Sequence, residues 1–397
     1  MLERIYIESY RTLRKTSVDF REGLNVIIGK NGVGKSNLMG FIANSAGIWL
    51  YIQGVSTITT PVSNYSYKLK RLNSDSNELT LEIAVEKIKP LSTEEHAERP
   101  FRIQVTRTIG SDTLSTPDYY TTTNDIRRKL QDGFLSLGSF QGTYVQFSLP
   151  KTLPYLQNAA GMSVSKGETP VFNRERVRLS FLHSFEFILE FSDSSDNGLD
   201  DLGILKETLL EAFEESITNV NLNEHLNNFT NIQQVRLSPN INIYKTDTGA
   251  VVENLVLEFM VDDSWMPWSY LSDGTKRSFQ IIAEVVAAKN ELVLIEEPEI
   301  GLHPTQLFKI MTFLKEQAQE KQIIISTHSP EVLNVLEPDE LDNILIATIE
   351  KGRTSFHRLS EQKKAKAKTY MTEVGDLSSY WLHSDMEDAE EEEAAHD

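Results

Sequence analysis

Cysteine is absent from the 397-residue sequence, and basic residues are scarce relative to acidic ones. Without cysteine the chain can form neither disulfides nor thiolate metal sites. It has 39 Lys and Arg against 58 Asp and Glu, a net charge of −19, which argues against a protein that coats nucleic acid or anionic membrane non-specifically. Hydrophobic residues make up 40% of the chain, so a sizeable core can be buried and wholesale disorder is excluded.

Long hydrophobic runs are missing too. The most apolar stretches, Phe41–Ile52 and Ile281–Ala288, are far shorter than a membrane span and are interrupted by Asn44 and Glu284. The first residues contain no apolar segment of the kind found in signal peptides. We therefore expect a soluble, cytoplasmic protein.

Part of the acidity belongs to one end of the chain. The last thirteen residues contain eight acids and no Lys or Arg, and removing eight charges from −19 leaves −11 for the rest. The acids are Asp385, Glu387, Asp388, Glu390, Glu391, Glu392, Glu393 and Asp397. We expect 384–397 to be a disordered acidic tail, which either aids solubility or binds a basic partner.

Apolar strand patterns alternate with helical patterns along much of the chain, which predicts an α/β fold. Residues 1–150 open with strands that end in the apolar run Leu24–Ile28, and between about 65 and 110 they read as an antiparallel meander. Strands and helices resume over 240–350. We expect these two segments to form one domain with a mixed sheet and an antiparallel β subdomain, followed by a C-terminal segment at 351–383.

Residues 151–239 differ in character from their flanks. Arg176–Phe191 and Leu202–Val220 carry apolar residues at helical spacing, and the turn-rich stretch Ser192–Asp201 separates them. This pattern predicts a helical insertion.

The segment Gly29–Ser36 fits the phosphate-binding loop G-x-x-x-x-G-K-[ST], and it lies between an apolar strand and a predicted helix. Glycines let backbone N–H groups approach phosphates, and the helix start adds a positive end. Lys35 brings a charge to the β- and γ-phosphates, while the Ser36 hydroxyl completes Mg²⁺ coordination. The candidate nucleotide-binding residues are Gly29, Asn31, Gly32, Gly34, Lys35 and Ser36.

Two further segments place polar residues at the ends of apolar strands. Leu292–Ile295 runs into Glu296 and Glu297, and a second strand ends in Ser326-Thr327-His328-Ser329. In parallel sheets the carboxyl ends of the strands border the ligand crevice. One carboxylate there can hold the Mg²⁺ water shell while the next orients the attacking water, and His328 could sense the γ-phosphate.

A small-polar turn, Leu271–Ser278, opens another predicted helix. Helix N-termini favour anions, yet this one begins with Lys276 and Arg277. The two cations suit a phosphate that docks at the helix start, and simple capping of the helix is the alternative.

The order of these segments resembles the ABC-type ATPase superfamily, in particular its SMC, RecF and OLD-like branch. The resemblance covers roughly 1–50, 110–150 and 240–350, and it includes Ile7–Leu13 and Glu296–Pro304. It implies a P-loop NTPase fold of ABC/SMC-head type that hydrolyses ATP with Mg²⁺. Most members of the superfamily have Asp at the position of Glu296 and Gly at the position of Asp273. Glu and Asp at these positions resemble the OLD-like members.

The resemblance also implies roles for individual residues. Two heads sandwich ATP, so that the phosphate loop of one subunit faces the other subunit's Ser272, Gly274 and Lys276. The resemblance assigns the general base, the Mg²⁺-side acid and the γ-phosphate switch to Glu297, Glu296 and His328.

Three other polar residues are less specific matches. Gln146 resembles the Mg²⁺-contacting glutamine of SMC heads, although Gln141 is nearby. Arg11 or Arg14 could reach a phosphate or serve only as a surface cation.

The resemblance leaves the biological role open between two classes. Too few residues follow His328 for the nuclease domain of OLD-like nucleases, and the sequence lacks the heptads of SMC arms. A stand-alone OLD-like ATPase that gates a separately encoded effector, as in two-gene antiphage systems such as PARIS and Septu, is our first expectation. A RecF-like DNA-maintenance ATPase is the alternative. Its candidate phosphate contacts are Lys68, Lys70, Arg71, Lys363, Lys364, Lys366 and Lys368.

Overall fold

The structure is a computed structural model. It describes residues 2–45, 65–72, 78–87, 101–109, 112–115, 119–121, 142–145, 177–182, 186–192, 206–207, 210, 214, 218, 221–246, 249–287, 292–384 and 386. The chain forms two compact units. The first contains Met1–Phe147, Ala288–Glu299 and Leu314–Asp397, and the second contains Ser148–Ala287 and Ile300–Phe313.

A mixed sheet forms the framework of the first unit. Its described strands follow the order β7-β6-β5-β4-β1-β2-β20-β19-β3-β18-β17-β9, with β8 paired to β6. Their bounds are β1 Leu2–Tyr10, β2 Leu13–Asp19, β3 Leu24–Ile28, β4 Tyr65–Leu72, β5 Glu78–Lys87, β6 Phe101–Ile109, β7 Asp112–Ser115, β8 Tyr119–Thr121, β9 Gly142–Val145, β17 Leu292–Glu296, β18 Gln322–Thr327, β19 Ile344–Glu350 and β20 Arg353–His357.

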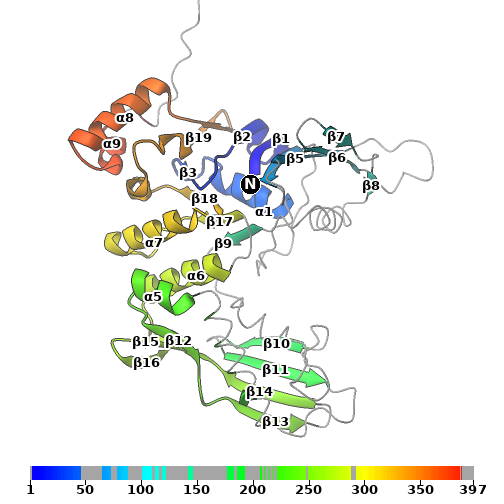
Figure 1. The fold of residues 1–397 in the computed structure, drawn as a ribbon, viewed down its shortest axis with the longest axis vertical. Coiled ribbons are helices and arrows are strands. Elements are labelled where there is room, and N and C mark those ends of the chain that lie inside the picture. The colour runs from blue at the N-terminus through cyan, green and yellow to red at the C-terminus, as the bar shows by residue number, and fades with distance from the viewer. Residues whose placement is uncertain are drawn as a thin grey trace, which may run out of the picture. The chain divides into compact units, whose positions relative to one another are not determined.

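One half of this sheet is parallel. Strands β19, β3, β18, β17 and β9 are parallel neighbours in that order, and every residue of β3, β17 and β18 is buried. Helix α1 (Lys35–Ser45) packs against β17, β18 and β9. In Figure 1 the blue N-terminal elements β3 and α1 lie beside the yellow-to-orange strands β17, β18 and β19. Parallel pairing therefore brings the carboxyl ends of β3, β17 and β18 to one edge of the sheet.

The other half is antiparallel. β1 pairs with β2 and β4, β4 with β5, and β5 with β6, all antiparallel. This arrangement confirms the predicted mixed sheet with its antiparallel subdomain.

The C-terminal part of the first unit contributes the strand that joins the two halves of the sheet. β20 pairs antiparallel with β19 and parallel with β2. The remaining elements are the 3₁₀ turns η3 Pro330–Val335 and η4 Leu341–Asn343 and the helices α8 Glu361–Glu373 and α9 Leu377–His383. Of the predicted acidic tail, Ser384 and Met386 are described, and the other residues lie outside the described part.

The second unit holds two antiparallel sheets, ordered β10-β11-β14-β13 and β12-β15-β16 (Figure 1). Its strands are β10 Val177–Leu182, β11 Glu186–Ser192, β12 Gln234–Leu237, β13 Asn242–Thr246, β14 Gly249–Leu255, β15 Leu257–Val261 and β16 Ser264–Pro267. Its other elements are α5 Leu222–Phe229, η2 Trp268–Tyr270 and α6 Asp273–Ala287, and α7 Pro304–Gln317 begins in this unit and ends in the first.

The prediction of a helix over Arg176–Phe191 is wrong, because Val177–Leu182 and Glu186–Ser192 are the antiparallel strands β10 and β11. Within β10, Val177, Leu179 and Phe181 recur with the period of two that a strand requires, and β11 gains a second partner in β14. The insertion is therefore not purely helical. Among the described positions of Leu202–Val220, residues 206, 207, 210, 214 and 218 are helical.

The two compact units divide the chain differently from the predicted domains. The expected boundary at 239 falls inside the second unit, because β12 on one side of it pairs with β15 on the other. Within the described part of the chain, no helix has the length and apolar composition that a membrane crossing needs.

Candidate functional site at the carboxyl edge of the parallel strands

The loop Gly29–Ser36 connects the buried strand β3 to α1, as its motif predicts. Two of its glycines are required by close packing. A Cβ on Gly29 would lie 2.3 Å from the carbonyl oxygen of Ala347 in β19. Gly34 has a φ of +103°, and a Cβ there would lie 2.3 Å from Thr354 Oγ1. Only glycine fits these two positions without displacing the neighbouring chain.

A cluster of hydroxyl and amide groups supports this loop from outside. Thr354 Oγ1 in β20 lies 2.6 Å from Thr12 Oγ1 and 2.7 Å from the Val33 carbonyl oxygen. The Asn37 side chain donates to Thr12 Oγ1 at 2.8 Å, and Arg11 donates to Asn37 Oδ1 at 3.1 Å. Sequence reasoning missed Thr12 and Thr354, because no motif links residues so far apart in the chain.

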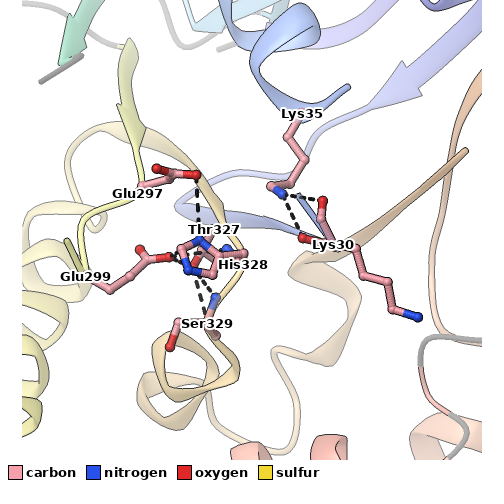
Figure 2. A network of polar contacts seen from close by, with 8 residues as sticks. Lys30, Lys35, Glu297, Glu299, Thr327, His328 and Ser329 are labelled. Atoms are coloured by element: carbon pink, nitrogen blue, oxygen red, sulfur yellow. Dashed lines mark hydrogen bonds and ion pairs between the residues drawn. The ribbon is translucent and has the colours of Figure 1, made fainter. Parts of the chain in front are cut away.

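Lys35 is held inside its own loop. Its ammonium donates to the carbonyl oxygens of Gly29 at 2.6 Å and Lys30 at 2.9 Å (Figure 2). Burial lowers the pKa of Lys35 below its ordinary value, and the carboxylates of Glu297, Glu299 and, less strongly, Glu296 oppose that shift. The lysine is thus a buried cation facing three acids, and the adjoining Ser36 and Asn31 are exposed.

The two predicted acids lie at the end of β17, beside β18. Glu296 is buried and pairs in register with Ser326. Glu297 has a φ of 46°, a left-handed conformation that is uncommon for a non-glycine residue. Its backbone N–H donates to the Ser326 carbonyl at 2.7 Å, which anchors the turn. The loop therefore keeps one carboxylate in the core and turns the next out of the strand.

His328 follows β18 and lies between two carboxylates of that loop. Its Nδ1 is 3.6 Å from Glu297 Oε1 and 3.3 Å from Glu299 Oε1, and both acids point toward the imidazole in Figure 2. The structure thus brings together Lys35, Glu296, Glu297 and His328, as the sequence predicts. Sequence reasoning assigned no role to Glu299, although the residue belongs to the motif that signalled its neighbours.

The turn before α6 lies in the second unit. Ser272 Oγ accepts from the Thr275 backbone N–H at 3.2 Å, so it caps the helix start. Lys276 lies 3.7 Å from Asp273 and 5.9 Å from the Trp268 ring centroid, and Arg277 is buried. Capping and charge pairing within the turn therefore account for part of this segment without a ligand.

Packing fixes the orientation of this turn within its unit. The rings of Phe259, Trp268 and Phe279 pack in edge-on and tilted arrangements with centroids 4.9–5.8 Å apart and join β15, η2 and α6. A Cβ on Gly274 would lie 2.9 Å from the Gly301 carbonyl oxygen. The first turn of α6 consequently rests directly on the backbone of the loop that follows the double acid.

The remaining predicted site residues stand as follows. Gln146 and Gln141 lie outside the described residues. Arg14 contacts the Ser9 hydroxyl. Across the described ranges, no group of three or more His, Asp or Glu side chains is arranged to hold a metal ion by itself.

Two family models match the chain. One, described as "AAA ATPase domain", matches residues 1–140, and the other, described as "AAA domain, putative AbiEii toxin, Type IV TA system", matches residues 161–334. An ATP/GTP phosphatase of Helicobacter pylori is 21% identical over 356 residues, which cover 85% of this chain and 88% of the relative. The DNA double-strand break repair Rad50 ATPase of Methanopyrus kandleri is 46% identical over 39 residues, 10% of this chain and 4% of that protein.

Among solved structures, an SMC head bound to the C-winged helix domain of ScpA aligns with a TM-score of 0.50 and 14% identity, over 92% of this chain and 99% of that one. The chain is an ATPase with an SMC-head fold. This ATPase has the predicted fold class and the predicted enzymatic activity.

Proposed function

We propose that this ATPase hydrolyses ATP at the edge formed by β3, β17 and β18, dimerises around the nucleotide, and gates a separate effector protein. The observation that carries the catalytic part is a cluster at the ends of three parallel strands. It consists of a buried loop lysine, the carboxylate of a residue with a left-handed backbone, and a histidine. This edge is where ligands bind in open α/β sheets.

Phosphate binding is assigned to the loop Gly29–Ser36. Its glycines allow backbone N–H groups to face an anion, and α1 directs its positive end at the same place. Lys35 donates to the carbonyl oxygens of Gly29 and Lys30. A triphosphate is a stronger acceptor than these carbonyls, because the hydrogen bond becomes one between two ions. Asn31 and Gly32 complete the proposed loop contacts.

Two oxygen donors near this loop fit Mg²⁺. The Ser36 hydroxyl is exposed at the start of α1, and the Glu296 carboxylate ends β17, while Mg²⁺ prefers a small number of protein oxygens together with phosphates and waters. Gln146 is the third proposed donor. When bound, Mg²⁺ neutralises charge on the β- and γ-phosphates.

Glu297 is the proposed general base and His328 the proposed γ-phosphate switch. The left-handed turn presents the Glu297 carboxylate outside the sheet, and its Oε1 lies 3.6 Å from His328 Nδ1. A carboxylate in this position can orient and deprotonate the attacking water, while the imidazole can donate to the phosphate.

The dimer is proposed from the turn Leu271–Ser278, whose Ser272, Gly274 and Lys276 would face the partner's nucleotide. Mixing two inactive variants tests this. Ser272→Arg keeps its own phosphate loop, and Lys35→Ala keeps its own turn. If sites are shared, each dimer that contains one chain of each variant carries one intact site. Such dimers make up half of an equal mixture, so the mixture regains up to about a quarter of wild-type activity.

The activity of the mixture tests whether two subunits share each ATP site. Rescue by the pair, with none when both substitutions are in the same chain, supports the shared site. Full hydrolysis by Ser272→Arg alone would show that the turn does not complete a partner's site.

A separate effector protein is favoured over DNA by the charges. The net charge is −19, and within the lysine group of α8, Lys363 is buried and Lys364 lies 2.9 Å from Asp342. A role in bacterial antiphage defence is part of this proposal, and the description of one matching family model names a "putative AbiEii toxin, Type IV TA system". Co-purification with the product of a neighbouring gene, without duplex binding, is the expected result. ATP-dependent, salt-sensitive duplex binding would favour the RecF-like alternative instead.

A further inference from the structure

The loop after β17 carries a third acid, Glu299, which is held differently from Glu297. The Glu299 side chain is only 9% exposed, whereas that of Glu297 is 34% exposed. Glu299 Oε1 accepts from Thr327 Oγ1 at 2.6 Å and from the backbone N–H of His328 at 3.2 Å. The carboxylate is thus fixed to the same short segment of chain that carries the histidine.

The same oxygen faces the imidazole ring. Glu299 Oε1 lies 3.3 Å from His328 Nδ1, closer than the 3.6 Å that separates Nδ1 from Glu297 Oε1. Figure 2 shows the two acids approaching the ring from one loop. Pro298 lies between the two acids and restricts the backbone there. The backbone between Glu297 and Glu299 therefore has few ways to change the separation of the two carboxylates.

We propose that Glu299 is the positioning residue of His328: its carboxylate holds the proton on Nδ1, fixes the ring, and leaves Nε2 to act on the nucleotide. This inference rests on the proposed role of His328 at the γ-phosphate. A carboxylate beside one ring nitrogen sets the tautomer and stabilises the protonated ring. It also leaves Glu297 for the water, because the imidazole has its own acidic neighbour.

The charge of Glu299 is not needed for packing alone. Thr327 Oγ1 and the His328 N–H require only an acceptor oxygen, which a glutamine also provides. Within the described part of the chain, Glu299 Oε2 is buried and has no hydrogen-bond partner. Burying a charged oxygen in this way is costly, and the positively polarised ring edge is the group that this charge can stabilise.

The test is Glu299→Gln, which keeps the acceptor and removes the charge. We expect kcat to fall by roughly 10-fold or more, as when a partner that orients a functional histidine is lost, while the Kd for ATP stays within about 2-fold. Glu331→Gln is the matched control, because Glu331 is exposed in η3 of the same segment, and its kcat should not change.

A double-mutant cycle separates positioning from a general structural effect. In a His328→Gln background, Glu299→Gln should cost less than about 2-fold in kcat, because its effect passes through the imidazole. Thr327→Val, which removes the hydroxyl that fixes the carboxylate, should give a smaller loss that also disappears in that background. An equal loss with and without His328 would overturn the inference.

The tautomer of the His328 imidazole provides a second measurement. The ¹⁵N signals of His328, assigned by their absence in His328→Gln, should show a protonated Nδ1 in the wild type and a shift toward protonated Nε2 in Glu299→Ala, which removes the acceptor oxygen that faces Nδ1. An unchanged tautomer would also overturn the inference. Full hydrolysis by Glu297→Gln would instead contradict the proposed function, so the two failures are distinguishable.

Discussion

Gly34 and Thr354 approach so closely that a Cβ on the glycine would lie 2.3 Å from the threonine hydroxyl oxygen. That hydroxyl also lies 2.7 Å from the Val33 carbonyl oxygen. A strand from the far end of the chain therefore braces the phosphate loop. The loop keeps its shape through this neighbour as well as through its own motif.

Gly34→Ala should disrupt the loop, because the new methyl meets Thr354 Oγ1 and the φ of +103° disfavours an L-residue. We expect ATP binding to be lost and the protein to be destabilised by about 1–3 kcal/mol. Gly40→Ala is the matched control, since a Cβ there meets nothing within 4 Å. Gly40→Ala should leave ATP binding intact and raise the free energy of unfolding by up to about 1 kcal/mol, because alanine has the higher helix propensity. Calorimetric titration with ATP and urea unfolding measure both, and equal effects of the two variants would contradict the packing argument.

Lys35→Ala removes the cation that faces Glu296, Glu297 and Glu299. Losing one partner of a buried charge pair costs about 2–5 kcal/mol, so ATP affinity should fall by roughly 30-fold or more, as measured by titration calorimetry. Lys366→Ala, on the exposed side of α8, serves as the control for loss of a single positive charge. Unchanged affinity in Lys35→Ala would exclude the loop as the phosphate site.

Glu297→Gln keeps the size of the side chain and removes its basicity. Loss of a general base lowers turnover by roughly 10²–10⁴-fold, and the variant should accumulate an ATP-bound assembly that is visible by light scattering after gel filtration. Phosphate release and the mass of the assembly are the two measurements. Wild-type turnover would remove Glu297 from the mechanism.

Glu284 predicts a pH dependence of stability. It sits in the apolar stretch of α6, and burial raises its pKa from 4.5 to about 7. The folded protein therefore keeps a proton that the unfolded chain releases, so the free energy of unfolding falls as the pH rises from about 4.5 to about 7, by up to about 3 kcal/mol. Glu284→Gln should be more stable than wild type at pH 8 and nearly equal to it at pH 5 in urea unfolding. Glu320→Gln is the control, because Glu320 is exposed. If Glu284→Gln raised the free energy of unfolding equally at pH 5 and pH 8, the burial argument would be contradicted.

The parallel half of the sheet and most of the site are predictable from sequence. Continuous apolar runs such as Leu292–Ile295 are typical of strands covered on both faces, and the polar ends of parallel strands meet at one edge. Lys35, Glu296, Glu297 and His328 accordingly lie where the motifs predict.

The errors and omissions have a common physical origin. Val177–Leu182 and Glu186–Ser192 are strands because they pair with each other and with Gly249–Leu255, and such distant pairing overrides a local pattern. Thr354 beside Gly34, and Glu299 beside His328, are contacts that only the folded backbone creates.

The path of the chain through the central sheet has a consequence for biosynthesis. Val33 and Thr354, which touch in the finished protein, are 321 positions apart, and β3 pairs with β18 and β19 on its two sides. A ribosome exposes the apolar strand β3 and its loop long before either partner strand has been made. The nascent chain therefore carries an unpaired strand edge throughout most of translation, which is the state most prone to aggregation. The contact between Thr354 and the Val33 carbonyl oxygen can form only when β20 has emerged.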